Sequence, residues 1–149
     1  MSAEEDVRKV SNKFYSGLNR MANGGDTSLI KEAWAQDENV TAMHPIGVRD
    51  VGWKAVIKSF DQVSELASDG KVGLNDQLIR VVGDVAYELG TEYGEFKVAG
   101  QKCTLEQRVT NIYQKQGGTW KMIHHHADTS PAMMEIISRL QPAMEKAGR

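Results

Sequence analysis

Residues 101–128 read QKCTLEQRVTNIYQKQGGTWKMIHHHAD, and this stretch decides the predicted fold class. Two runs rich in Val, Ile, Tyr and Thr, at about 101–115 and 119–128, flank the pair Gly117-Gly118, which is the pattern of a β-hairpin. Two similar runs precede this hairpin, at about 72–82 and 84–97. Short breaks between long runs favour an antiparallel meander over parallel strands joined by crossover helices.

Outside these four runs, apolar residues recur at spacings of three and four, which predicts helices. The predicted helices lie at 7–23, after Asp26-Thr27, at 52–70, and from Ser130-Pro131 onward. Between the second and third, Asn39 to His44 predicts a short strand that Pro45 ends.

Helices that gather on one face of an antiparallel sheet form an α+β layer. We therefore predict a curved antiparallel sheet, made of the four-strand meander plus the short strand, with helices over its concave face. Such a cone-shaped half-barrel has a hollow between its two layers, because long strands twist and curl. The sequence shows no linker or repeat, so one domain is expected over residues 1–149.

The composition is that of a globular protein, with 40% hydrophobic and 26% charged residues. A formal charge of -2 gives no electrostatic reason to expect nucleic acid or an anionic membrane as a partner. The single cysteine, Cys103, rules out an internal disulfide, and the sequence has neither a secretory signal nor an apolar stretch of membrane-spanning length. A cytoplasmic location is therefore expected.

Charged residues alternate along the third run of the meander and suggest a polar floor for the hollow. Glu106 and Arg108 share one face of this run, and Arg108 would lie opposite His126 if the hairpin closes around residues 116–118. His44 could face this cluster from the short strand. Histidine transfers protons near neutral pH and arginine holds carboxylates, so the group predicts a catalytic or ligand-binding site. The alternative is a cross-strand ion pair between Glu106 and Arg108 beside ordinary histidines.

The triplet His124-His125-His126 also allows a metal hypothesis, because alternate residues place two imidazoles on one strand face. A zinc site would need a third ligand, which His44 or Glu106 could supply. No CxxC or HExxH pattern accompanies the triplet, so we expect neither a metal nor a cofactor.

Three segments resemble the SnoaL-like branch of the nuclear-transport-factor-2-like superfamily: Gly83 to Tyr87, Arg108 to Thr110, and Gly117 to His126. That superfamily also contains ketosteroid isomerases, scytalone dehydratases, polyketide cyclases and the association domain of calmodulin-dependent kinase II. The resemblance implies a curved sheet under helices, a pocket at the open end, and commonly a homodimer packed sheet to sheet.

The resemblance also gives His44 a role. Ala42 to Gly47 is similar to the segment in which ketosteroid isomerases carry their proton-shuttling aspartate, and His44 fills that position. Their oxyanion tyrosine would fall near Leu18, so it is absent unless Tyr15 replaces it. Arg108 matches an arginine that the association domains turn into their pocket.

Three functions are compatible with these residues. A binding module would hold a small carboxylate- or carbonyl-bearing molecule through Arg108, Glu106, His126, His44 and Tyr15. An isomerase, cyclase or dehydratase without a cofactor would use His44 or His126 as general base, with Arg108 stabilising the oxyanion. An oligomerisation module would use the outer face of the sheet.

Overall fold

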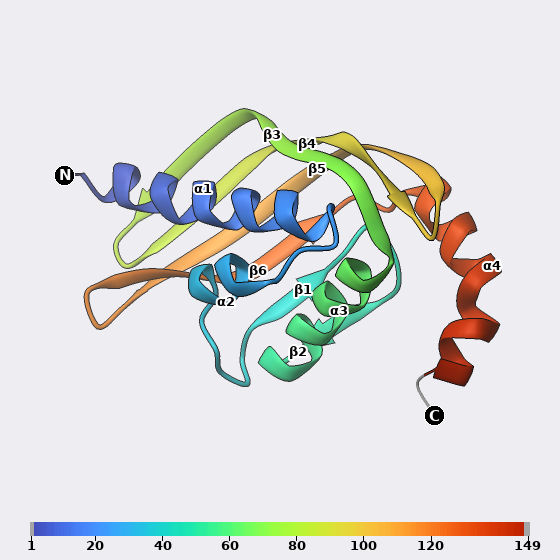
Figure 1. Cartoon of the computed structure of the whole chain (residues 1–149). Helices are drawn as coiled ribbons and strands as arrows, with labels where there is room; N and C mark the ends of the chain where they lie inside the picture. The colour runs from blue at the N-terminus through green and yellow to red at the C-terminus, as the bar shows by residue number, and fades with distance from the viewer. Residues whose placement is uncertain (1, 148–149) are drawn as a thin grey trace.

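The computed structural model describes the backbone of residues 2–147 and the side chains of residues 2–140. The elements follow one another as α1 (Ala3–Met21), α2 (Ser28–Ala33), β1 (Thr41–Met43), β2 (Arg49–Val51), α3 (Trp53–Leu66), β3 (Ala67–Val82), β4 (Val85–Val98), β5 (Gln101–Gln116), β6 (Thr119–Ala127) and α4 (Pro131–Ala147) (Figure 1). This order confirms the α+β class that the sequence predicts.

The strands form one six-stranded sheet in the order β2-β1-β6-β5-β4-β3. β3 to β6 form the predicted antiparallel meander. Two features of the short strands differ from the prediction: β1 pairs parallel to β6, so the sheet is mixed, and β2 is a second short strand that pairs with β1. The loop through Pro45 and Gly47 turns the chain from β1 back into β2, with Gly47 at φ 77°.

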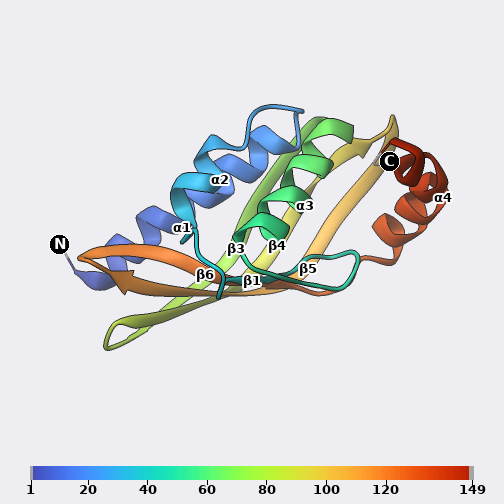
Figure 2. The same cartoon turned by 90° about the horizontal axis from the view of Figure 1, so that it is seen from below.

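The helices α1, α2 and α3 lie on the same face of the curved sheet, and α4 stands at one end of it (Figure 2). α1 begins with a capping box between Ser2 and Glu5 and buries an apolar stripe that includes Phe14. The Phe14 ring packs edge-on against Trp34 and Phe60, with ring centroids 6.3 and 5.9 Å apart. This aromatic group joins the three helices into one core above the sheet.

A β-bulge in β6 decides which histidine of the triplet enters the core. Ile112 pairs with His124 while its neighbour Tyr113 pairs with Met122, so Ile123 is an extra residue in β6. An extra residue in a strand moves every side chain after it to the opposite face of the sheet. His124 and His126 therefore lie on the face opposite to Trp120 and Met122, and His125 points inward.

The junction between α3 and β3 also differs from the prediction. α3 ends at Leu66 and β3 begins at Ala67, before the expected stop at Asp69-Gly70. Asp69 has φ 53°, and the β3–β4 register shifts between Ser68 and Lys71, so the strand passes through these turn-forming residues as an irregular segment. Among the residues that the structure describes, no helix combines the length and apolar character needed to cross a bilayer.

Candidate functional site

A cavity of about 660 Å³ lies between the concave face of the sheet, α3, the β1–β2 loop and α4. Its walls are mainly apolar and come from elements far apart in sequence. They include Leu18, Met21, Phe60, Val63, Leu66, Val72, Phe96, Val98, Leu105, Met133 and Ile137. A cavity of this size and character suits a small, mostly apolar molecule.

One polar group in the cavity wall centres on His44 and Asp50. His44 Nε2 lies 3.2 Å from Asp50 Oδ2, within ion-pair distance but without the alignment of a hydrogen bond. Ser59 Oγ donates a hydrogen bond of 2.5 Å to the same Asp50 oxygen. Burial alone would raise the pKa of Asp50, but the contacts with His44 and Ser59 outweigh it and leave that pKa below its ordinary value. Asp50 is therefore an ionised carboxylate placed to orient the His44 ring.

The second polar group lies at the buried end of the cavity, where Glu92 of β4 meets His125 of β6. Glu92 Oε2 accepts a hydrogen bond of 3.0 Å from Tyr15 Oη and lies 3.5 Å from His125 Nε2. Burial raises the pKa of Glu92 from 4.5 to about 7; the Tyr15 hydrogen bond opposes this rise and the Glu88 charge adds to it. Burial, and then the charges of the other three histidines, hold the pKa of His125 well below 6.5. Near neutral pH the pair thus combines an uncharged imidazole with a carboxyl group that can carry a proton.

The two groups converge on the same space. The rings of His44 and His125 have centroids 6.1 Å apart, and both residues line the cavity together with Asp50 and Glu92. Phe60 packs edge-on against the His44 ring at 4.8 Å and fixes its position. A small molecule in the cavity would meet proton donors and acceptors of both groups within mainly apolar walls.

The remaining predicted site residues lie elsewhere. The Arg108 side chain is 85% exposed on the outer face of the sheet, where its Nε lies 2.7 Å from Asp128 Oδ2. Glu106 and His126 are exposed on the same face, because β5 buries Leu105 and Val109 and the bulge turns His126 outward. His126 pairs with Thr110 and not, as predicted, with Arg108, and both residues line an open hollow of about 380 Å³ outside the cavity.

The predicted polar floor of Glu106, Arg108 and His126 is therefore not the floor of the cavity. The alternative of a structural ion pair describes Arg108 better, with Asp128 rather than Glu106 as its partner. Tyr15 does not line the cavity, but its hydroxyl donates to Glu92, which does. Of the predicted residues, His44 alone lines the cavity.

The histidine triplet has no metal-site geometry. His124 Nδ1 lies 2.7 Å from Thr41 Oγ1, and the His124 and His126 rings have centroids 6.2 Å apart, while His125 points to the other face. Within the described part of the chain, no group of three His, Cys, Asp or Glu side chains could hold a metal ion.

Three cavity residues that the site uses, Asp50, Glu92 and His125, are not among the predicted site residues. Asp50 lies in β2, whose three residues are too few to show a period. The inward position of Glu92 could have been predicted from the sequence. Even-numbered residues of β4, such as Phe96 and Val98, lie on the buried face, and Glu92 is one of them. For His125 no signal existed, because the bulge that turns it inward adds one residue without any change in composition.

The SnoaL-like domain family matches residues 12–133 of the chain. No curated protein matches the sequence. The match spans α2 to β6 in full, about half of α1 and the start of α4, and so includes the elements that position His44, Asp50, Glu92 and His125.

Solved structures with the same fold have different names. A candidate dehydratase of the NTF2-like family from Streptomyces avermitilis is 22% identical, covers 87% of this chain and 96% of its own, and has a TM-score of 0.74. The CaMKII hub of S. rosetta is 23% identical over 87% and 98%, with a TM-score of 0.69. A candidate ketosteroid isomerase from Shewanella frigidimarina is 17% identical over 83% and 94%, with a TM-score of 0.66. At these identities the likeness is one of fold.

Proposed function

The chain belongs to the SnoaL-like domain family, and we propose that it is an enzyme that moves a proton on a small, mostly apolar molecule bearing a carbonyl or hydroxyl group. One observation carries this proposal: His44–Asp50 and His125–Glu92 line the same mainly apolar cavity, with the two imidazole rings 6.1 Å apart. Isomerisation and dehydration next to a carbonyl are the reactions that such paired acid–base groups serve without a cofactor.

His44 is the proposed general base. Asp50 contacts the ring at Nε2, which favours a proton on that nitrogen and leaves Nδ1 to accept one from the carbon next to the ligand carbonyl. The electrons of that C–H bond move to the carbonyl oxygen, where protonated Glu92 is a suitable donor. Because the walls are mainly apolar, such a hydrogen bond stabilises the oxyanion more than it would in solvent.

Exchange of α-protons tests the proposal with simple ketones in place of the natural substrate. We expect small cyclic and aromatic ketones that stabilise the protein against heat to exchange their α-protons with deuterium oxide, followed by ¹H NMR. His44→Asn should slow this exchange about 10²–10⁴-fold. His126→Asn, on the outer face, is the matched control and should exchange like wild type.

The outcomes separate catalysis from binding. Ketones that bind without exchange in the wild-type protein would support a binding module and contradict the proposed catalysis. The arginine-based form of that binding hypothesis has lost its support, because Arg108 is exposed and paired with Asp128 outside the cavity.

A homodimer is a second proposal, and it concerns the other face of the sheet. Large apolar side chains are exposed there on neighbouring strands: Leu78 of β3 lies opposite Leu89 of β4, with Tyr87 and Tyr93 along the same β4 face. Exposed apolar groups gathered on one face are typical of an interface. We also propose a cytoplasmic location, which fits the single, buried thiol of Cys103. Light scattering on the intact protein tests the dimer.

A further inference from the structure

A second buried carboxylate, Glu88, lies behind the cavity and does not line it. Each of its oxygens accepts hydrogen bonds from two donors. Oε2 accepts from Ser11 Oγ and Gln77 Nε2, both at 2.6 Å, and Oε1 accepts from Asn111 Nδ2 and Tyr113 Oη, both at 2.8 Å. Gln77 Nε2 and Asn111 Nδ2 can only donate, so each oxygen of Glu88 accepts at least one hydrogen bond from an amide.

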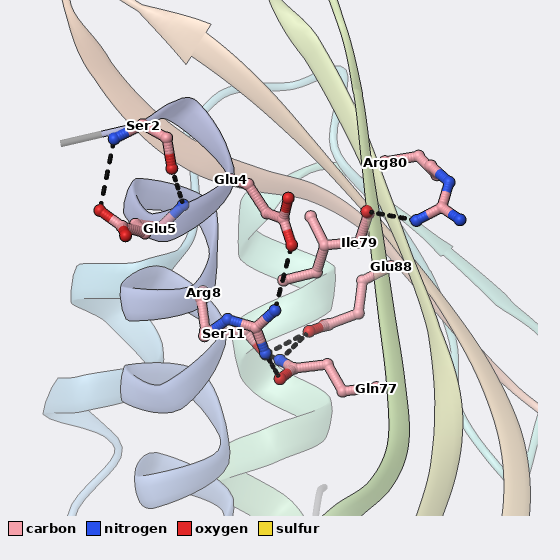
Figure 3. Close-up of polar contacts among 9 residues, drawn as sticks. All are labelled: Ser2, Glu4, Glu5, Arg8, Ser11, Gln77, Ile79, Arg80 and Glu88. Carbon is pink, nitrogen blue, oxygen red and sulfur yellow. Dashed lines mark hydrogen bonds and ion pairs between the residues drawn. The ribbon is translucent and has the colours of Figure 1, made fainter.

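The outer end of this network is fixed by Arg8 of α1. Its guanidinium donates to Gln77 Oε1, and Figure 3 shows Arg8, Gln77, Ser11 and Glu88 in one connected group between α1 and the strands. Arginine can only donate, so the amide of Gln77 must turn its oxygen to Arg8 and its nitrogen to Glu88. The orientation of Gln77 is thereby set from the helix side.

The inner end of the network leads to the cavity. Asn111 donates both of its amide hydrogens, one to Glu88 Oε1 and one to Tyr15 Oη at 3.1 Å. Its oxygen is then the only atom left for His125, whose Nδ1 lies 2.6 Å from Asn111 Oδ1. Because an amide oxygen cannot donate, His125 Nδ1 must carry the proton in this contact.

We propose that Glu88 is a positioning residue that fixes the tautomer of His125 through Asn111. The imidazole is held with its proton on Nδ1, so Nε2 presents a lone pair toward Glu92 and the cavity. The lowered pKa of His125 is consistent with this tautomer, because a neutral imidazole carries a proton on only one of its two nitrogens.

The catalytic meaning of this inference rests on the proposed function. A lone pair on Nε2 can accept a proton from Glu92 or from a ligand hydroxyl, but it cannot donate to a carbonyl oxygen. The site therefore selects a ligand whose hydroxyl meets His125 and whose carbonyl lies elsewhere in the cavity, as in a hydroxyketone.

NMR of the uniformly ¹⁵N-labelled protein tests the tautomer directly and needs no ligand. Long-range ¹H–¹⁵N spectra distinguish a protonated from an unprotonated ring nitrogen, and a His125→Asn variant assigns the signal. We expect His125 in the wild-type protein to show a protonated Nδ1 and an unprotonated Nε2. A protonated Nε2 and an unprotonated Nδ1 in the wild-type protein would overturn the inference, and this result needs no Glu88 variant.

Glu88→Gln tests the role of the carboxylate. Arg8 locks Gln77, so the new amide should offer its oxygen to Gln77 and its nitrogen to Asn111, which then rotates and offers its nitrogen to His125. We expect the His125 proton to move to Nε2. Tyr113→Phe is the matched control, because it removes a donor from Glu88 and adds none, and it should keep the proton on Nδ1.

A folded Glu88→Gln protein, checked by circular dichroism, with the proton still on Nδ1 would overturn the positioning role. A switch in Tyr113→Phe as well would overturn it too, because any disturbance of the network would then suffice. The ketone exchange experiment is independent of both: its failure would remove the proposed reaction and leave the measured tautomer standing.

Discussion

At the scale of single residues, the buried carboxyl group of Glu92 makes the stability of the protein depend on pH. Its pKa is about 7 when folded, against 4.5 for an ordinary glutamate. Between these values the folded state binds more protons than the unfolded state, so raising the pH weakens folding. His125 acts in the opposite direction below about pH 6.5, because its depressed pKa makes the unfolded state bind more protons.

A comparison with Glu92→Gln isolates the Glu92 contribution. Tyr15, Glu88 and His125 face the group and remain in both proteins. Relative to wild type, we expect Glu92→Gln to gain about 2–3 kcal/mol in free energy of unfolding between about pH 5 and about pH 8, measured by urea denaturation. Glu106→Gln, an exposed carboxyl group on the outer face, should show no such trend. A difference between Glu92→Gln and wild type that does not change with pH would contradict the raised pKa.

Sequence reasoning at this scale succeeds where a local pattern constrains the residue. The short strand and the Pro45 turn that follows it place His44, and it does line the cavity. Arg108 is placed in the pocket by its charge, by an assumed hairpin register and by a resemblance, and none of these determines which face of the strand is concave. The alternation along β5 puts Arg108 with the exposed residues, and only the paired strands reveal which alternate face is concave.

At the scale of elements, Gly94 allows β4 to approach β3 closely. Its φ is 143°, and a Cβ there would lie 1.9 Å from the carbonyl oxygen of Lys71. Gly94→Ala should therefore force the two strands apart and lower the free energy of unfolding by about 2–4 kcal/mol in urea denaturation. Gly83→Ala is the control: its φ is 63° but nothing lies within 4 Å, so it should cost only about 1 kcal/mol. Equal losses in both variants would show that the close approach to Lys71 is not important.

The elements themselves could largely be predicted. The meander and its breaks follow from strand composition and paired glycines, and α4 begins as expected, with Met133 N donating to Ser130 Oγ at 3.2 Å. β2 could not be predicted, since three residues are too few to show a period. The bulge at Ile123 was equally hidden, because pairing between strands, and not composition, creates it.

At the scale of the whole molecule, the sheet separates two surfaces with different chemistry. Its concave face carries the acid–base groups of the cavity, and its outer face carries exposed apolar and charged side chains such as Leu89 and Arg108. The sequence predicts the cone and the family, but it assigns the polar residues of the outer face to the cavity. The error arises because the curvature of the sheet decides which face is concave, and this curvature depends on all the strands together.

Because the two faces are separate, we expect one variant to lose dimerisation but keep proton exchange, and another to lose exchange but keep the dimer. Leu89→Glu places a charge in the proposed dimer interface and should yield a monomer by light scattering, while α-proton exchange in the ketone assay stays near the wild-type rate. His44→Asn should give the reverse result, with slow exchange and an unchanged molar mass. The introduced glutamates of two subunits would repel each other at the interface without altering the cavity, because neither Leu89 nor its cross-strand neighbour Leu78 lines the cavity. Loss of exchange in a folded Leu89→Glu monomer would contradict this separation and would mean that the cavity needs the second subunit to be complete.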